Sequence, residues 1–474
     1  MKGIAQLALI AVAAIAHAAA AQDCRNIAAP PLRPIGVEQP KRIQLDNGMV
    51  ILLAEDHELP LVYAAARMRG GRLKVPAGKA GLSTVYYKAW RTGGTASKTG
   101  DQLDEILEGR GAMLETYCAD PNCSVTFDTL KEDLDTVFPL FVDLLRHPAF
   151  RQDKIDLAKT YEKSAIARRN DYAGDIASRE AWLLGFGPES PMARLSEYAT
   201  IASITRDDLV AFHDRFVVPN NMIVAVAGDF DSASMERRLR DAFGSWPRGT
   251  PVAAPAIPVH RAKPGVYFVE KDDVTQSAVL LISGQGTLFS DPDFAAVQVL
   301  NQIISGGFSG RLMNDIRSKR GLAYSVGGGV GLGFEPPLWL TSVSLGTKSE
   351  TTVEGITATR DVLASLRSEP PTAEEIEAAK ETILNRYVFT MDTKRKILDQ
   401  RLNLEFYGYP ADFWQKYPAA IRAVTAADVT RVAKKYFRPD QLITIVVGKS
   451  SDFDRPLGTL GPVTTVDVTI PGKP

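Results

Sequence analysis

The chain has 474 residues, of which 55 are basic and 56 acidic, so its formal net charge is -1. This length exceeds what one ordinary hydrophobic core organises and predicts two domains or more. The even charge excludes the basic excess typical of nucleic-acid binding, and the composition is that of a globular protein.

The first 21 residues have the pattern of a secretory signal peptide. Lys2 supplies a positive charge, residues 4–15 form a short apolar core, and residues 19–21 offer small side chains for cleavage. An uncleaved anchor helix is the alternative, but the run is short and rich in alanine, and no other stretch approaches the roughly 20 apolar residues that span a bilayer. We therefore expect a periplasmic or secreted protein without membrane contact after cleavage.

Several elements follow in chain order. Residues 22–40 are rich in proline and predict an extended arm. The Asn-Gly pair at 47–48 between two apolar runs predicts a hairpin. Apolar residues at helical spacing predict helices at 101–108 and 133–145, and a further helix is expected from 152 to about 169.

A second proline-rich stretch at 247–264 predicts a linker between two domains. Five prolines there exclude a helix or a central strand. The chain is thereby divided into a first domain at 41–246, a second domain at 265–455 and a C-terminal tail at 456–474.

The two domains share a repeated segment. In each, a Thr-x-x-Asp capping signal starts an amphipathic helix, a proline turn ends it, and an apolar strand runs to a glycine. The matched residues are Thr205, Asp208, Pro219 and Gly228, which recur 220 residues later as Thr425, Asp428, Pro439 and Gly448. The sequence therefore predicts an α+β protein made of two homologous halves, each a sheet with helices packed on it.

Two of the three cysteines lie close together. Cys118 and Cys123 flank a short turn, and an exported chain meets an oxidising compartment, so we expect a local disulfide. A pair of free thiols is the alternative. No second pair of cysteines or histidines is present to complete a zinc knuckle.

Together with the duplication, the segment from Ser305 to Val326 resembles the pitrilysin/insulinase family of zinc peptidases. The similarity covers about residues 40–450 and is closest to the short two-domain type that includes the subunits of the mitochondrial processing peptidase. It implies two mainly antiparallel sheets in a clamshell arrangement that encloses peptide substrates.

Active members of that family carry His-x-x-Glu-His on a helix, with two zinc-binding histidines and a glutamate as general base. The matching positions here hold Thr84, Tyr87 and Lys88, so the resemblance implies a degenerate site. A third ligand comes from a later helix, where this chain has Glu162, which we expect to be a surface residue. The histidines after the signal peptide are widely separated: His57, His147, His213 and His260. We expect no metal in this chain.

The resemblance also implies substrate-binding residues. Arg317 and Tyr324 match a family pair that reaches across to the zinc-bearing half, where both groups donate hydrogen bonds to the substrate and its oxyanion. The glycines just before this pair, Gly306 and Gly307, belong to the same matched stretch. In the first half, Leu114 and Glu115 lie in the stretch that matches the substrate-binding sheet edge. Residues 327–329, three glycines, predict a flexible turn.

These features predict half of an enzyme. The chain is expected to be inactive alone and to supply Arg317 and Tyr324 in trans to a homologous partner that holds the zinc signature, forming a heteromeric metalloendopeptidase that acts on peptides. The alternative is a catalytically inactive scaffold or peptide-binding subunit, which has no reason to keep that pair. An autonomous hydrolase has no support, because the sequence contains no set of nucleophile, base and orienting group.

Overall fold

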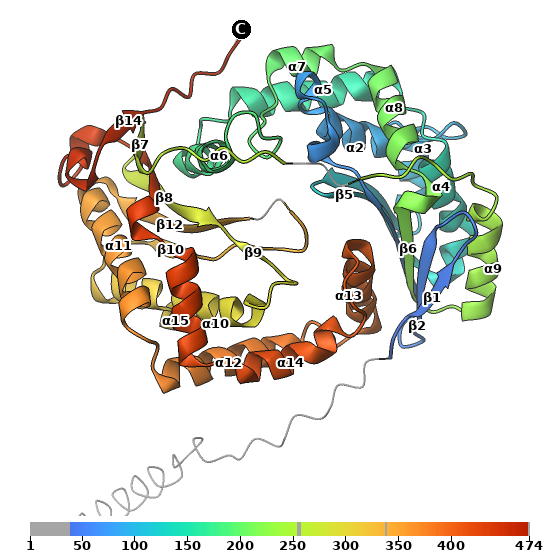
Figure 1. The fold of residues 1–474 in the computed structure, drawn as a ribbon. Coiled ribbons are helices and arrows are strands. Elements are labelled where there is room, and N and C mark those ends of the chain that lie inside the picture. The colour runs from blue at the N-terminus through green and yellow to red at the C-terminus, as the bar shows by residue number, and fades with distance from the viewer. Residues whose placement is uncertain (1–37, 254–256, 337–338, 473–474) are drawn as a thin grey trace, which may run out of the picture. The chain divides into compact units, whose positions relative to one another are not determined.

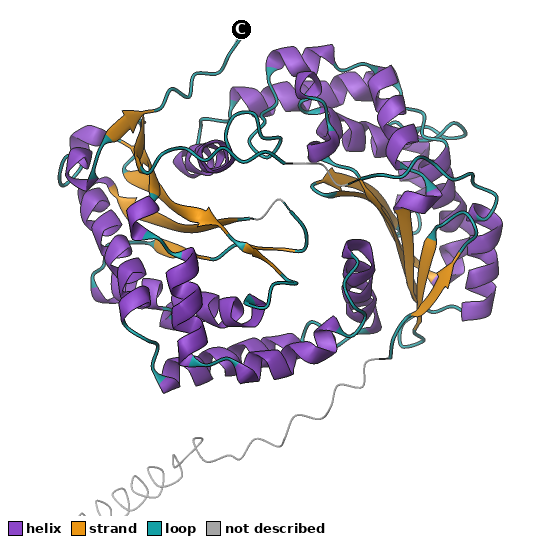
Figure 2. Ribbon diagram, viewed as in Figure 1, coloured by secondary structure: helices purple, strands orange, loops and turns teal. Residues whose placement is uncertain are grey.

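The computed structural model describes residues 38–253, 257–336 and 339–472. The signal peptide predicted at 1–21, and nearly all of the arm at 22–40, fall outside these residues. Within them the chain forms two six-stranded sheets covered by helices (Figure 1), which confirms the expected α+β class. Figure 2 shows how the strands gather into the two sheets. No described helix has the length and apolar character that crossing a bilayer requires.

The first sheet has the strand order β1-β2-β6-β3-β5-β4. It opens with the predicted hairpin, in which Gly48 adopts a φ of 90° that favours glycine. Asn47 fixes the turn, since its side-chain amide donates to the backbone oxygen of Phe243 at 2.7 Å. The predicted helices are present as α3, α4 and α5. The strands of this half are β1 (Lys41–Gln44), β2 (Val50–Glu55), β3 (Leu61–Arg69), β4 (Met113–Ala119), β5 (Asn122–Leu130) and β6 (Met222–Gly228). Its helices are α2 (Leu82–Thr92), α3 (Gly100–Glu108), α4 (Leu134–Arg146), α5 (Gln152–Ala167), α6 (Ala173–Phe186), α7 (Tyr198–Ser203), α8 (Arg206–Phe216) and α9 (Ser232–Phe243).

The second sheet has the order β10-β12-β8-β13-β7-β14 and repeats the first over five strands. One pair in each sheet is parallel, β2 with β6 in the first and β7 with β13 in the second. From β6 to the β4 edge, and from β13 to the β10 edge, neighbouring strands pair antiparallel. The glycines at 327–329 lie in edge strand β10, so the prediction of a flexible turn was wrong. The strands are β7 (Gly265–Glu270), β8 (Gln276–Gln285), β10 (Ser325–Gly329), β12 (Leu340–Lys348), β13 (Ile443–Gly448) and β14 (Val463–Thr465), with β9 (Thr287–Leu288) and β11 (Leu332–Gly333) as a separate pair. The helices are α10 (Phe294–Ser305), α11 (Thr352–Ser368), α12 (Ala373–Val388), α13 (Lys394–Tyr407), α14 (Phe413–Ala423) and α15 (Ala426–Tyr436).

The repeated segment has the same geometry in both halves. The hydroxyl of Thr205 accepts a hydrogen bond from the backbone N–H of Asp208 at 3.2 Å and caps α8. Thr425 and Asp428 cap α15 in the same way, also at 3.2 Å. Each helix then leads into a central strand, β6 or β13. The predicted duplication is therefore confirmed down to its capping hydrogen bonds.

Each sheet is completed by a helix of the other half. The core of the first half lies on the face of β2 that carries Ile51 and Leu53, whereas the opposite face, with Leu52 and Ala54, packs against α13. In return, α6 of the first half covers the second sheet. The two helices occupy equivalent places in the duplication. Their buried contacts come from Leu398, Leu402 and Phe406 of α13 and from Ile176, Ala177 and Ala181 of α6.

The segment predicted as a C-terminal tail, residues 456–474, is part of this arrangement. It supplies β14, which pairs with β7 in parallel, whereas the corresponding outer strand of the first sheet, β1, is antiparallel. Val466 and Val468 then pack beside α6, and the side chain of Asn170 donates to the backbone oxygen of Val468 at 2.7 Å. Ile470 is buried in the core of the first half. The tail therefore contacts both halves.

Candidate functional site

The three positions that match the zinc signature lie on helix α2. This helix begins after Gly81, whose φ is 97° and where a Cβ would approach Ile201 to 2.4 Å, so only glycine fits. Its buried side, which includes Val85 and Trp90, packs into the core of the first half. The signature positions lie on the partly exposed side, at the i, i+3 and i+4 spacing that brings side chains together: Thr84, Tyr87 and Lys88.

An ion pair joins this face of α2 to helix α5. The Nζ atom of Lys88 lies 2.9 Å from the Oε1 atom of Glu162, and the two side chains are 30% and 11% exposed. The prediction that Glu162 is a surface residue was wrong. It lies on the stripe of α5 that packs inward together with Ile155, Ala158 and Ile166, at helical spacing.

These residues do not fit a zinc ion. The ammonium of Lys88 is a cation with no lone pair to offer, and it takes up the one carboxylate that would serve as third ligand. A threonine hydroxyl and a phenol complete no ligand set with it. Across residues 38–253, 257–336 and 339–472, no group of three or more His, Cys, Asp or Glu is arranged to hold a metal. That this chain binds no zinc stays a prediction, tested below.

A pocket of about 300 Å³ opens beside the ion pair and reaches edge strand β4. Tyr87, Lys88 and Tyr161 line it, and the ring of Tyr161 lies 5.8 Å from the Nζ atom of Lys88. Of the two β4 residues predicted to bind substrate, Glu115 lines the pocket, whereas the side chain of Leu114 is buried in the core. Strand β4 pairs only with β5 among the described strands, so it is an open edge.

The outer face of β4 carries two large exposed side chains, Met113 and Tyr117, on either side of Glu115. Met113 is 58% and Tyr117 55% exposed, and the ring of Tyr117 lies 5.7 Å from that of Tyr87. At the end of the strand, Cys118 faces Cys123 across the β4–β5 hairpin, and a disulfide joins them. The pocket therefore lies beside an open sheet edge, to which an extended chain can add as a further strand.

In the second half, Arg317 and Tyr324 lie together. Arg317 is on the short π-helix η7 (Met313–Lys319), which ends where Gly321 adopts a φ of 67°. Tyr324 follows with 77% of its surface exposed. The guanidinium carbon of Arg317 lies 5.3 Å from the centre of the Tyr324 ring and 5.1 Å from that of Phe308. Sequence reasoning missed Phe308, although it directly follows the matched glycines.

Gly306 and Gly307 make the turn that precedes Phe308. A Cβ at Gly306 would lie 2.2 Å from the backbone oxygen of Gln302, and Gly307 has a φ of 76°. Both glycines are therefore required by the backbone. No hydrogen bond, ion pair or ring contact within the described chain connects Arg317 or Tyr324 with the Lys88 pocket.

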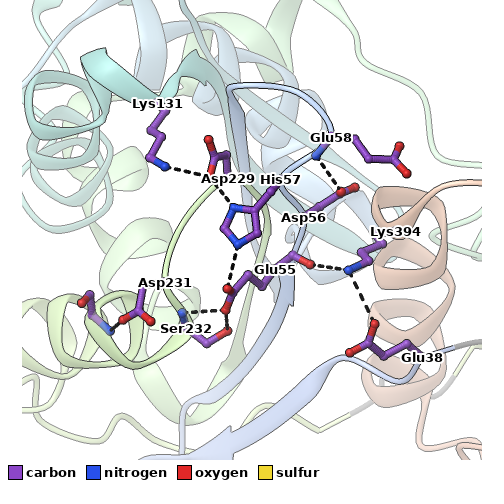
Figure 3. A network of polar contacts seen from close by, with 11 residues as sticks. Glu38, Glu55, Asp56, His57, Glu58, Lys131, Asp229, Asp231, Ser232 and Lys394 are labelled. Carbon is purple, nitrogen blue, oxygen red and sulfur yellow. Dashed lines mark hydrogen bonds and ion pairs between the residues drawn. The ribbon is translucent and has the colours of Figure 1, made fainter.

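A second polar cluster lies where the first half meets α13 (Figure 3). The ring of His57 bridges two carboxylates, with Nδ1 at 2.5 Å from Asp229 and Nε2 at 2.9 Å from Glu55. The bond to Asp229, followed by the bond to Glu55, raises the pKa of His57. Lys394 at the start of α13 donates to the backbone oxygen of Glu55 at 2.7 Å. The Ser232 hydroxyl donates to Glu55 and not to His57, so this serine is not paired with the histidine as in a serine–histidine nucleophile.

Another histidine, His213, is a core residue. His213 is buried, its Nδ1 lies 2.9 Å from the hydroxyl of Tyr86, and its Nε2 lies 3.0 Å from the backbone oxygen of Leu145. Burial lowers the pKa of His213 to about 3. Both ring nitrogens are satisfied in the neutral form, so His213 contributes to packing and not to a site.

Several known proteins resemble this chain in sequence and in fold. Residues 203–383 match the sequence model of the family described as Peptidase M16 inactive domain. The chain is 23% identical over 417 residues to a Helicobacter pylori protein described as non-peptidase homolog YmxG, covering 85% of this chain and 92% of that one. It is 30% identical over 237 residues to an uncharacterized zinc protease of Mycobacterium leprae, covering 49% and 53% of the two chains. Among solved structures, a peptidase M16 inactive domain from Pseudomonas fluorescens has the same fold, with a TM-score of 0.78, 23% identity, and coverage of 88% of this chain and 100% of that one.

Proposed function

The chain belongs to the M16 family of zinc peptidases, the pitrilysin/insulinase family, and from this membership we propose that it is the metal-free subunit of a heteromeric peptidase. The observation that carries the proposal is the Lys88–Glu162 ion pair, which stands at the positions where active members hold zinc. A chain with that pair needs a homologous partner with the His-x-x-Glu-His signature in order to hydrolyse a peptide. Zinc is then held by the partner alone.

The first half supports a role in holding peptides without cutting them. Strand β4 offers an open edge, and exposed apolar side chains lie along it at Met113 and Tyr117. An extended peptide gains main-chain hydrogen bonds by adding to such an edge, while alternate side chains enter neighbouring pockets. The pocket beside Lys88 lies next to Glu115 of this edge, so a bound peptide would meet an ammonium in place of a metal.

The second half supports a contribution to the chemistry of the partner. Arg317 and Tyr324 carry N–H and O–H donors, and both side chains reach solvent. Donors aimed at the oxyanion of a tetrahedral intermediate are worth about 2.7–4 kcal/mol each. In the proposed complex these two groups act on a peptide whose scissile bond lies at the zinc of the partner.

The proposal includes the compartment. The signal-peptide pattern at 1–21 lies outside the described residues, and it supports export to the periplasm or beyond the cell. Substrate peptides and the zinc-bearing partner would share that compartment.

A peptidase assay with a fluorogenic peptide library and added zinc tests the proposal. The chain is measured alone, mixed with a homologous zinc-signature chain from the same organism, and in that mixture as Arg317→Ala or Tyr324→Phe. We expect no activity alone, activity in the mixture, and a loss of about tenfold or more for each variant. Lys319→Ala, an exposed change on the same π-helix, is the matched control and should leave the activity unchanged.

The other outcomes are equally informative. Activity in the mixture that ignores both substitutions would assign the chain the alternative role of a scaffold or peptide-binding subunit. Zinc-dependent activity of the chain alone would refute the proposal.

A further inference from the structure

The side chain of Arg317 lies between two exposed aromatic rings. Its guanidinium carbon is 5.1 Å from the ring centre of Phe308 and 5.3 Å from that of Tyr324. The two rings are 69% and 77% exposed, although a phenylalanine is usually buried. Because the ring of Phe308 is exposed and lies against Arg317, its role is the contact with the guanidinium and not the burial of apolar surface.

Stacking of this kind leaves the arginine free to bind. A ring attracts a guanidinium through its flat face, whereas the five N–H donors of arginine point outward within the plane. Within the described chain, the guanidinium of Arg317 makes no hydrogen bond to a protein group and no ion pair, so those donors remain available. The two rings therefore restrict the orientation of the guanidinium without using any of its donors.

The backbone before Phe308 is built for this contact. Helix α10 ends at Ser305, and Gly306 and Gly307 then reverse the chain in a turn that a Cβ at Gly306 would block. The N–H of Gly310 donates to the oxygen of Gly307 at 3.2 Å and closes the turn around Phe308. Consequently, the glycine pair that the sequence analysis assigned to substrate binding has a local structural reason, which is to present the ring.

We propose that Phe308 is a positioning residue, which together with Tyr324 holds the guanidinium of Arg317 so that its N–H edge meets the substrate. The inference rests on the proposed function, because it assumes that Arg317 acts on a peptide held by the partner. An aromatic ring is required at this position, since an aliphatic side chain of similar size has no ring face to attract the cation.

Steady-state kinetics of the mixture test this requirement. Phe308→Ala and Phe308→Leu should lower kcat by roughly tenfold to a hundredfold through misplacement of a catalytic donor. KM should change little, because most peptide contacts lie elsewhere. Phe308→Tyr and Phe308→Trp should restore most of the activity. Wild-type kcat for Phe308→Leu would overturn the proposal, because packing alone would then suffice.

A second measurement separates this proposal from the proposed function. In the chain alone, labelled with ¹⁵N-arginine, the Nε–Hε resonance of Arg317 is assigned by its loss in Arg317→Lys. Ring currents should displace it from the position of solvated arginines, Phe308→Leu should return it toward that position, and Phe308→Tyr should not. If the mixture is inactive but these shifts occur, the proposed function fails and the positioning by Phe308 stands. If Phe308→Leu leaves the resonance in place, the positioning role is refuted whatever the mixture does.

Discussion

Removing the charge of Lys88 should destabilise the first half, because it leaves Glu162 largely buried without its cation. Glu162 is 11% and Lys88 30% exposed in the ion pair. Breaking a fully buried pair costs about 3–5 kcal/mol, whereas an exposed pair contributes about 0.2–1 kcal/mol. This pair lies between those limits, so we expect Lys88→Met to lower the free energy of unfolding by about 2 kcal/mol. Methionine keeps most of the apolar stem and removes the ammonium.

A double-mutant cycle isolates the interaction from the effects of each substitution. Urea unfolding is followed by circular dichroism for Lys88→Met, Glu162→Gln and the double variant. We expect the double variant to recover about 1–2 kcal/mol relative to the sum of the single losses, with an unchanged m-value. Lys163→Met, at an exposed neighbour on α5, is the control and should change stability by no more than about 0.5 kcal/mol.

Additive losses would contradict the coupling of Lys88 and Glu162. If the two single losses sum to that of the double variant within about 0.3–0.5 kcal/mol, the two side chains are not coupled. The ion pair could then not be what occupies the position of the metal in this chain.

Three further predictions concern the site, the pH dependence and the contact between the halves. The triple variant T84H/Y87E/K88H should bind one zinc ion per chain, measured by metal analysis after dialysis, because the acidic residue of α5 already lies beside position 88. The pKa of His213 is about 3 in the folded state and about 6.5 when unfolded. The stabilisation of the folded state by neutral, buried His213 is therefore complete above pH 6.5 and is lost as the pH decreases. Between pH 6.5 and 5 the loss in the free energy of unfolding should be about 2 kcal/mol, and His213→Gln should remove it. Leu402→Ala should lower the free energy of unfolding by about 3 kcal/mol, because that buried side chain joins α13 to the first sheet.

Each of these has its own control. Adding Glu162→Gln to the triple variant should weaken zinc binding. If the unmodified chain bound zinc as tightly as the triple variant, the prediction would be contradicted. An equal pH slope in His213→Gln would assign the acid effect to other groups. Leu157 is 44% exposed, so Leu157→Ala should change the free energy of unfolding little. If Leu402→Ala lowered it no more than Leu157→Ala does, α13 would not pack on the first sheet.

The fold could be predicted where local signals agree with one another. The Asn-Gly turn at 47–48, the apolar stripe of α4 and the capping threonines at 205 and 425 each specify their structure within a few residues. The duplication could be read because the same local signals recur at one spacing. The capping hydroxyls bond N–H groups three residues away and need no distant partner, whereas Asn47 also donates to Phe243 from the far end of the first half.

The sequence-based predictions are wrong where the position of a residue depends on a neighbour from another element. Glu162 is predicted on the surface, although it continues the buried stripe formed by Ile155, Ala158 and Ile166. The prediction of a turn at residues 327–329 fails because this strand is stabilised by pairing with β12 and not by the strand propensity of glycine. The exchange of α6 and α13 between the sheets also could not be predicted, because helical periodicity shows which face of a helix is buried but not which sheet it packs against.

That exchange has a consequence for any single half. Without α13 the first sheet exposes Leu52, Ala65 and Ala225, and without α6 the second exposes Ile443 and Ile445. Two copies of one unduplicated half would hide those faces by trading the same helix, which is the organisation of a domain-swapped homodimer. The present chain has that organisation with the two subunits fused through residues 247–264. Cleavage within this stretch would therefore not release two independent domains, but two fragments that stay folded only while they remain associated.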